Sequence, residues 1–255
     1  MESQKPKEPI IGIYNWCDRW CERCDFTDRC TLYAKDQEKR EEYEDPDSPE
    51  SFMEMIKESL AESMEALGDL AEEIGFEPEE EEEEIEANFA SWKEQDELIS
   101  KSELVKLTGD YTKQAHQLIS SSLHSKLTEG LIQQTEMGIL NEDTSSAKLS
   151  EIEEACDVIQ WYMFMVHVKS KSAIQSFHSD NWDDYTEEEK HYNGTAKVAN
   201  LTIERSIGAW EKLFAISGNE MEEILDILAL LQKAKKELES KFPNFQSFIR
   251  PGFDE

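Results

Sequence analysis

The sequence predicts an all-α protein, an antiparallel helical bundle that carries a small cysteine-rich metal lobe at its N-terminus. After residue 50, apolar residues recur at intervals of three and four along most of the chain. No alternating strand pattern of useful length appears outside Ile10 to Trp16. Four of the five cysteines fall within residues 17–30. Consecutive amphipathic helices joined by short turns bury their apolar stripes against one another, which favours a bundle.

The chain divides into three parts. Residues 1–35 form the metal lobe, in which the extended apolar stretch from Ile10 to Trp16 precedes the cysteines. Residues 36–50 form a charged linker that ends in the turn-forming sequence Asp45-Pro-Asp-Ser-Pro. Residues 51–255 form an acidic helical bundle. Within it we expect a mobile glutamate-rich connector at 77–86, because this stretch lacks the apolar side chains that would offset the entropy of ordering it.

The first half of the bundle contains two helical regions. A helix begins at Ser51 and ends at Gly75, with apolar residues on one face. Those residues are Phe52, Ile56, Leu60, Met64, Leu67 and Leu70. Helix resumes at Ile85 and continues to about Thr128, with a break near Ser100 to Ser102. Residues 130–146 contain Gly, Asn and Ser and are expected to form a loop.

The second half contains the strongest helix, from Leu149 to His178. Its centre, Trp161 to Val166, is apolar on every side and should be surrounded by other elements, with Ile159, Met163 and Val166 buried. Thr186 and Glu189 match a capping box for a helix that ends at Gly218 and Asn219. A final helix spans 220–241. The tail, 242–253, carries four phenylalanines and is expected to pack back on the bundle as an irregular strap.

The net charge of −32 is concentrated in one segment. Residues 36–97 contain 26 acids and four bases, a net charge of −22, whereas residues 1–35 are neutral. A strongly acidic surface repels nucleic acid and anionic lipid, so we expect neither as a partner. A basic protein is the partner that such a segment would attract.

No window approaches the length and hydropathy of a membrane span, and the first residues do not match a secretory signal. Closely spaced cysteines in a chain without such a signal are more typical of a cytoplasmic metal site than of disulfides. We therefore expect a cytoplasmic protein.

Cys17, Cys21, Cys24 and Cys30 are the predicted metal ligands. Their spacing is C-x3-C-x2-C-x5-C, so four thiolates can converge on one centre without help from the rest of the fold. Nearby aromatic residues can cover the sulfurs, and nearby arginines can offset the charge of the thiolates. The aromatic residues are Trp16, Trp20, Phe26 and Tyr33, and the arginines are Arg19, Arg23 and Arg29.

The sequence is compatible with two kinds of centre, one iron–sulfur cluster or one Zn²⁺. Structural zinc is usually held by two C-x2-C pairs that a longer stretch separates, whereas iron–sulfur clusters favour compact runs of cysteines. If Cys17, Cys21 and Cys24 lay on one helix, their sulfurs would spread over about 10 Å, which suits a [4Fe–4S] cube better than a single ion. The spacing therefore slightly favours the cluster.

The first three cysteines resemble the C-x3-C-x2-C motif of the radical SAM family. The resemblance covers eight residues, and Arg23 occupies the position where that family commonly has an aromatic residue. The chain lacks the alternating strands and helices that the family requires, and Cys30 would fill the open iron position. We therefore assign the chain to no family.

Two other patterns contain residue types that could form a second site. Cys156, His167 and His178 recur every eleven residues on one helix face, but neighbours lie about 16 Å apart, too far to share a metal. We interpret them, with Gln160, as buried groups that hydrogen-bond to partner helices.

Glu188 and His191 form one Glu-x-x-His pair of the kind used in ferritin-like di-iron sites. Such a site needs two pairs and further carboxylates, for which Glu154, Asp157 and Glu204 are the candidates, so a solvated face is the simpler interpretation.

Two functions follow from these observations. The first is a metal-binding accessory or redox-sensing protein whose four-cysteine iron–sulfur or zinc centre is docked on a helical bundle. The alternative is an acidic interaction or adaptor protein with a purely structural zinc site. Whether the chain is an enzyme stays open, although four protein thiolates leave no coordination position for a substrate. The sequence contains no nucleophile elbow, phosphate loop or dinucleotide fingerprint.

Overall fold

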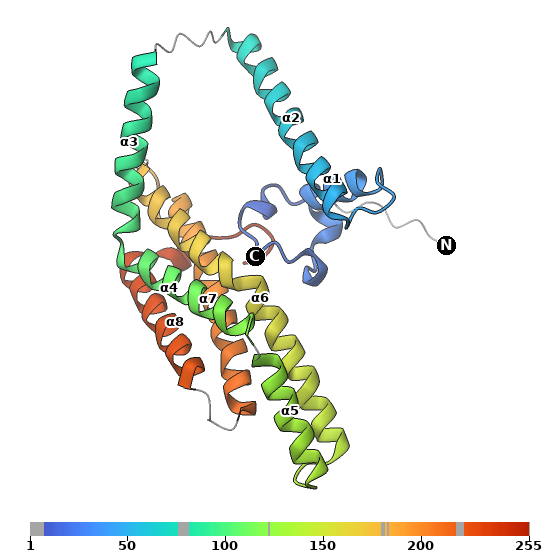
Figure 1. The fold of residues 1–255 in the computed structure, drawn as a ribbon. Helices are drawn as coiled ribbons and strands as arrows, with labels where there is room; N and C mark the ends of the chain where they lie inside the picture. Colours follow the sequence, from blue (N-terminus) through green and yellow to red (C-terminus); the bar gives the residue numbers. More distant parts are fainter. Residues whose placement is uncertain are drawn as a thin grey trace. The chain divides into compact units, whose positions relative to one another are not determined.

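The computed structural model describes residues 8–75, 82–121, 123–179, 182, 184–217 and 222–254. Within these ranges the protein is all-α: helices account for the regular structure and no strand is present (Figure 1). The α-helices are α1 (Thr31–Arg40), α2 (Pro49–Ile74), α3 (Glu82–Ser100), α4 (Glu103–Ile119), α5 (Leu123–Glu136), α6 (Glu142–Ser179), α7 (His191–Ile216) and α8 (Glu222–Lys241). Short 3-10 helices are η1 (Ile13–Asn15), η2 (Cys21–Arg23), η3 (Thr27–Arg29) and η4 (Phe245–Ser247).

The chain forms two compact units. The first contains residues 1–14 and 21–95, and the second contains residues 15–20 and 96–255. The boundary inside the cysteine segment places Cys17 in the second unit and the other three predicted ligands in the first. None of the helices in the described ranges is long and apolar enough to cross a membrane.

The second unit is a bundle built around α6 and α7. These helices run antiparallel, since Tyr162 of α6 lies beside Arg205 of α7 and Phe177 lies beside Tyr192. Helix α4 runs antiparallel to α6, because Thr108 contacts His167 and Thr112 donates to the Met163 carbonyl. Helix α5 packs along α6, and α8 packs against both α4 and α7 (Figure 1).

The core of the second unit is large and continuous. Predicted core residues Ile159, Met163 and Val166 are buried, which confirms that α6 is central. Trp210 of α7 and Tyr111 of α4 are fully buried, and the indole Nε1 of Trp210 donates to the Tyr111 hydroxyl at 3.4 Å. One face of α6 is nevertheless open, since Phe164 is 52% exposed. The expectation that other elements surround the apolar centre on every side is therefore wrong on that face.

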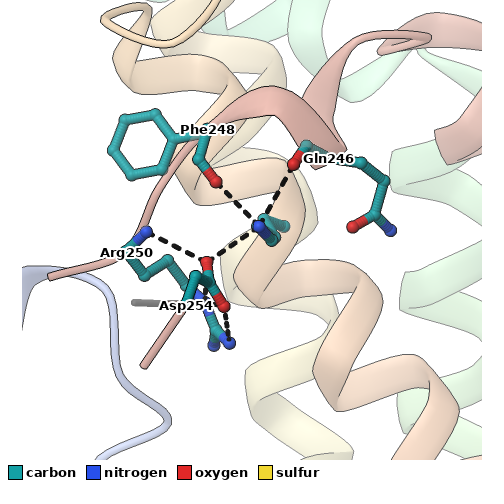
Figure 2. A network of polar contacts seen from close by, with 5 residues as sticks. Gln246, Phe248, Arg250 and Asp254 are labelled. Carbon is teal, nitrogen blue, oxygen red and sulfur yellow. Dashed lines mark hydrogen bonds and ion pairs between the residues drawn. The ribbon is translucent and has the colours of Figure 1, made fainter. Parts of the chain in front are cut away.

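The C-terminal tail packs on the bundle as the predicted strap. Phe242, Phe245 and Phe248 are buried. Figure 2 shows the polar contacts that hold the end of the tail. The Lys197 ammonium of α7 donates to the Gln246 and Phe248 carbonyls and pairs with Asp254 at 2.8 Å. Arg250 pairs with the same carboxylate at 2.8 Å.

Burial opposes the ionisation of Asp254, but the hydrogen bonds from Arg250 and Lys197 outweigh this cost. The pKa of the Asp254 carboxyl is therefore well below its ordinary value. The carboxylate is held charged at neutral pH. It links the strap to α7 through Lys197, and its ion pair with Arg250 lies within the strap.

The first unit has helices but almost no core. Helix α2 has strong end signals, because the Ser48 side chain accepts from the Ser51 amide, Pro49 occupies the first turn and Gly75 ends the helix with a left-handed φ of 67°. Among the described side chains of this unit, only Ile13 and Met55 are buried apolar residues. Good caps thus form a long helix here without packing it.

Several element boundaries differ from those expected. Residues 36–40 continue α1 instead of belonging to a linker, and the stretch from Ile10 to Trp16 is a turn and the 3-10 helix η1, with no strand. Residues 130–146 contain the end of α5 and the start of α6, so the loop is only 137–141. Residues 77–81 of the connector predicted at 77–86 lie outside the described residues. Residues 82–86 belong to α3.

Half of the capping box predicted at Thr186 forms, since the Thr186 amide reaches the Glu189 carboxylate while the Glu189 amide donates to the Thr186 carbonyl, and the contact closes a turn before the helix. The Thr186 amide and hydroxyl both donate to the Glu189 carboxylate, at 3.1 and 2.9 Å. Helix α7 begins only at His191, with Lys190 at the N-cap position. The break expected at Gly218 and Asn219 lies outside the described residues.

Candidate metal centre

Cys21, Cys24 and Cys30 lie in a short irregular segment of the first unit. Cys21 opens η2, and the Cys24 amide donates to the Cys21 carbonyl at 3.1 Å. Cys30 follows η3 and is the N-cap of α1. All three thiols are partly exposed, and no disulfide is present among the described cysteines. Donors held in tight 3-10 turns on a half-exposed loop are accessible to an ion from solvent.

Two of these sulfurs accept backbone hydrogen bonds. The Phe26 amide donates to Cys24 Sγ at 3.4 Å, and the Tyr33 amide donates to Cys30 Sγ at 3.5 Å. Cys30 also lies at the N-terminus of α1. The local backbone thus directs hydrogen-bond donors at two of the predicted ligands, an arrangement that metal–thiolate centres also use.

Residues 8–10 are hydrogen-bonded to the segment between Cys24 and Cys30. The Arg29 guanidinium donates to the Glu8 carbonyl at 2.9 Å, and the Ile10 amide donates to the Arg29 carbonyl at 3.0 Å. Ile13, in the following turn, is 2% exposed. These hydrogen bonds hold the cysteine segment of the first unit against residues 8–10 of the same chain, although they bury little apolar area.

Cys17 belongs to the second unit, in a segment that aromatic side chains fix to the bundle. Trp16 packs on Phe248 and on His191, with ring centroids 4.6 and 5.4 Å apart. Trp20 stacks on Trp161 of α6 at 5.0 Å. Gly194 of α7 makes room for this packing, because a Cβ there would lie 2.6 Å from the Trp16 ring and 2.7 Å from Phe248.

Asp18 holds the same segment through polar contacts. Its carboxylate accepts from the Tyr162 hydroxyl and pairs with Arg205, and its carbonyl accepts from Trp161 Nε1 at 3.0 Å. The Trp20 amide donates to the Asp18 carboxylate at 3.3 Å across Arg19, whose left-handed φ is 59°. Burial, then the hydrogen bond to Asp18, raises the pKa of Tyr162, so its hydroxyl remains a neutral donor.

Lys169 of α6 is the cation electrostatically coupled to Cys17. Burial lowers the pKa of Lys169, and the charge of Arg19 lowers it further, while Cys17 acts in the opposite direction. Burial and Arg19 outweigh the contribution of Cys17, so the pKa of Lys169 is lowered overall.

The described residues contain no group of three or more His, Cys, Asp or Glu side chains placed to hold one metal ion. This finding bears on the alternative sites as well. Cys156 is buried in α6, where burial raises the pKa of its thiol to about 11. Glu188 is exposed in a turn, and the His191 ring packs against Trp16 and Trp182. No ferritin-like site is therefore assembled from the described residues.

The histidines and Gln160 of α6 follow the expected structural role only in part. His167 Nδ1 lies 3.2 Å from the Thr108 hydroxyl, and burial, then the charges of Lys171 and Lys113, lowers its pKa. Gln160 and His178 are exposed, so they are not buried groups satisfied by partner helices as expected. The eleven-residue spacing drifts around the helix enough to take one end of the row to the surface.

Sequence reasoning missed the residues that anchor the Cys17 segment. Asp18, Arg205 and Gly194 stand out by no motif, and the contacts of Asp18 join positions 143 to 187 residues apart. The available signal was the density of tryptophans around Cys17, which had been interpreted as a cover for the sulfurs. The rings instead pack on α6, α7 and the strap.

Comparisons of the chain with protein-family models, with curated proteins and with solved structures find no match.

Proposed function

We propose that this protein is a metal-binding accessory protein with a redox or sensing role, in which Cys17, Cys21, Cys24 and Cys30 hold one iron–sulfur cluster or one zinc ion. The observation that carries the proposal is the spacing C-x3-C-x2-C-x5-C, with all four cysteines inside fourteen residues. The compact run favours the cluster, as bacterial ferredoxins use similarly short spacings.

Two structural features support a metal in this segment. Backbone amides already point at the Cys24 and Cys30 sulfurs, and hydrogen bonds of this kind tune metal–thiolate centres. Among its described side chains, the first unit buries only Ile13 and Met55 as apolar residues, and small domains with little core commonly gain stability from a metal or disulfides.

The proposal requires a conformational change on metal binding. Within the first unit, the thiols of Cys21, Cys24 and Cys30 are not gathered around one point, so an ion would have to draw them together. Coupling of this kind between metal binding and folding is common in small metal domains. We therefore expect residues 21–30 to gain protection from hydrogen exchange when the metal binds.

The test measures metal content and the visible spectrum of protein purified without oxygen. The wild type should contain one centre per chain, and broad visible absorbance would identify iron–sulfur. Cys21→Ser should lose most of the metal, whereas the matched control Cys156→Ser should retain it, because Cys156 is buried inside α6. Equal metal content in the two variants, or a wild type that binds neither iron nor zinc, would refute the proposal.

An acidic adaptor with a structural zinc site is the second candidate. The observation in its favour is the exposed apolar face of α2 within the most acidic part of the chain. A colourless protein with one zinc per chain would favour this candidate over the redox role.

A further inference from the structure

Helix α2 exposes a continuous row of large apolar side chains. Each member of the row is between 46% and 67% exposed. The row consists of Phe52, Met53, Ile56, Leu60, Met64, Leu67, Leu70 and Ile74. Single exposed apolar residues are ordinary, but a contiguous patch of this size typically marks an interaction surface. We call these eight residues the α2 stripe.

The spacing of the stripe is that of a helix-pairing seam. Met53, Ile56 and Leu60 alternate at intervals of three and four, and Leu67, Leu70 and Ile74 continue the same alternation. Only Ser63 interrupts the series. Heptad spacing of this kind fits knobs-into-holes packing against another helix. From Phe52 to Ile74 the seam is about 33 Å long, enough for a partner helix of about 22 residues.

The remainder of α2 is acidic. The helix contains eight acidic residues and one base, Lys57, and the acids lie away from the stripe. Helix α1 contacts this acidic side, since the Lys39 ammonium lies 3.0 Å from Glu62 and 3.7 Å from Glu58. The acidic side of α2 thus forms ion pairs with a lysine side chain. This contact leaves the α2 stripe exposed.

We propose that the α2 stripe docks a helix of another protein, one with an apolar seam bordered by lysine or arginine. The apolar seam would bury the stripe, and the basic border would meet the acidic flanks and the net charge of −22 carried by residues 36–97. The proposal goes beyond the metal centre and does not depend on it, because no predicted ligand lies in α2.

Charge favours a basic helix over the two other possible occupants of the stripe, a second copy of the chain and an anionic membrane. A second copy of the chain would bring two segments of charge −22 together, and their repulsion opposes pairing along the stripe. An anionic membrane surface repels the same segment, whereas amphipathic helices that lie on membranes carry basic polar faces. A basic helix satisfies both the apolar and the electrostatic requirement.

The experiment uses the full chain and two synthetic helical peptides of matched length. Both carry leucine at the seam positions, with lysine flanks in one and glutamate flanks in the other. The chain should bind the lysine peptide, with an affinity that falls as salt rises, and should bind the glutamate peptide at least about tenfold more weakly.

Three variants assign the binding to the stripe. Leu60→Ser combined with Leu67→Ser should lower the affinity for the lysine peptide by about tenfold or more. Ala61→Ser, on the opposite face of α2, should leave the affinity unchanged and controls for helix propensity. Glu54→Gln combined with Glu65→Gln should flatten the salt dependence while keeping binding. Metal content is measured on every variant, so the absence of peptide binding in a wild type that holds its metal refutes this proposal alone.

Other outcomes would overturn the inference. Equal binding of the two peptides would show that charge does not select the partner. A dimer in light scattering that the Leu60/Leu67 double variant dissociates would identify a second copy as the occupant. Binding to anionic vesicles, lost in the same variant, would identify a membrane. If the wild type binds neither peptide, the stripe is not a docking surface for a basic helix.

Discussion

The two units of the chain are both helical, but they differ in what holds their helices. In the second unit, Trp210, Tyr111 and Ile159 are fully buried within a core that takes side chains from α4 to α8. In the first unit, a helix of 26 residues buries one side chain, Met55. The second unit is stabilised by packing, whereas in the described part of the first unit α1 and α2 are capped and few apolar side chains are buried.

This contrast shows that helix formation and helix burial are separate properties of a sequence. Helix α2 has a serine N-cap, a proline in its first turn and a glycine C-cap, which together define its length. Caps contribute about 1 kcal/mol each, and most helical stability in proteins comes from tertiary packing. The first unit is therefore the part of the chain whose stability should depend on what it binds.

The largest expected effect is at the centre of the packed unit. Trp210→Ala empties a fully buried site and should lower the free energy of unfolding by about 3–5 kcal/mol. The matched truncation Leu60→Ala in α2, where the side chain is 60% exposed, should change it by no more than about 0.5 kcal/mol. Denaturant unfolding measures both. Comparable losses of unfolding free energy in the two variants would mean that α2 is packed in solution, and would contradict the difference described between the two units.

A smaller effect is expected at Gly194, where the Cys17 segment meets the bundle. In Gly194→Ala the new methyl group would overlap the rings of Trp16 and Phe248, which should cost about 1–3 kcal/mol. Gly208→Ala, in the same helix with nothing within 4 Å of the new Cβ, should be neutral or stabilise the protein by up to about 1 kcal/mol. A thermal melt of each variant tests this pair, and equal melting temperatures would contradict the packing described for Trp16.

The smallest expected effect is at the strap and depends on pH. Because the pKa of Asp254 is lower in the folded state than in the unfolded chain, the folded protein binds fewer protons there. Its contribution to stability is present above about pH 4 and is lost as the pH falls through the folded value. Asp254→Asn should therefore cost about 1 kcal/mol at pH 7, and the difference from wild type should shrink on acidification. A difference that grows in acid would contradict this sign.

Much of the helical fold followed from local patterns. The helix from Ser51 to Gly75, the break after Ser100 and the central place of Ile159 and Met163 were all predicted from periodicity and caps. The loop at 130–146 was overestimated because Gly130 was interpreted as a helix end. Glycine lowers helix propensity by about 1 kcal/mol, which the packing of Leu127 and Leu131 overrides.

The anchoring of the cysteine segment could not be predicted in the same way. A helix is encoded within a few residues, but the contacts of Asp18 with Tyr162 and Arg205 depend on the register between α6 and α7. The periodicity of the sequence specifies which face of each helix is apolar and leaves that register open. The exposure of the α2 stripe was equally unpredictable, because an apolar face has the same pattern whether or not a partner covers it.

The position of Asp18 in the chain has a consequence for synthesis on the ribosome. Residues 15–20 leave the ribosome early, but the side chains that receive them, Tyr162 and Arg205, are made more than 140 residues later. At about 5–20 residues per second, the segment waits roughly 10–40 s for α7 to be completed. During that interval Cys17 and its neighbours are displayed on an unfinished chain, so the metal proposed above would reach Cys17 at this stage with the least obstruction from the bundle.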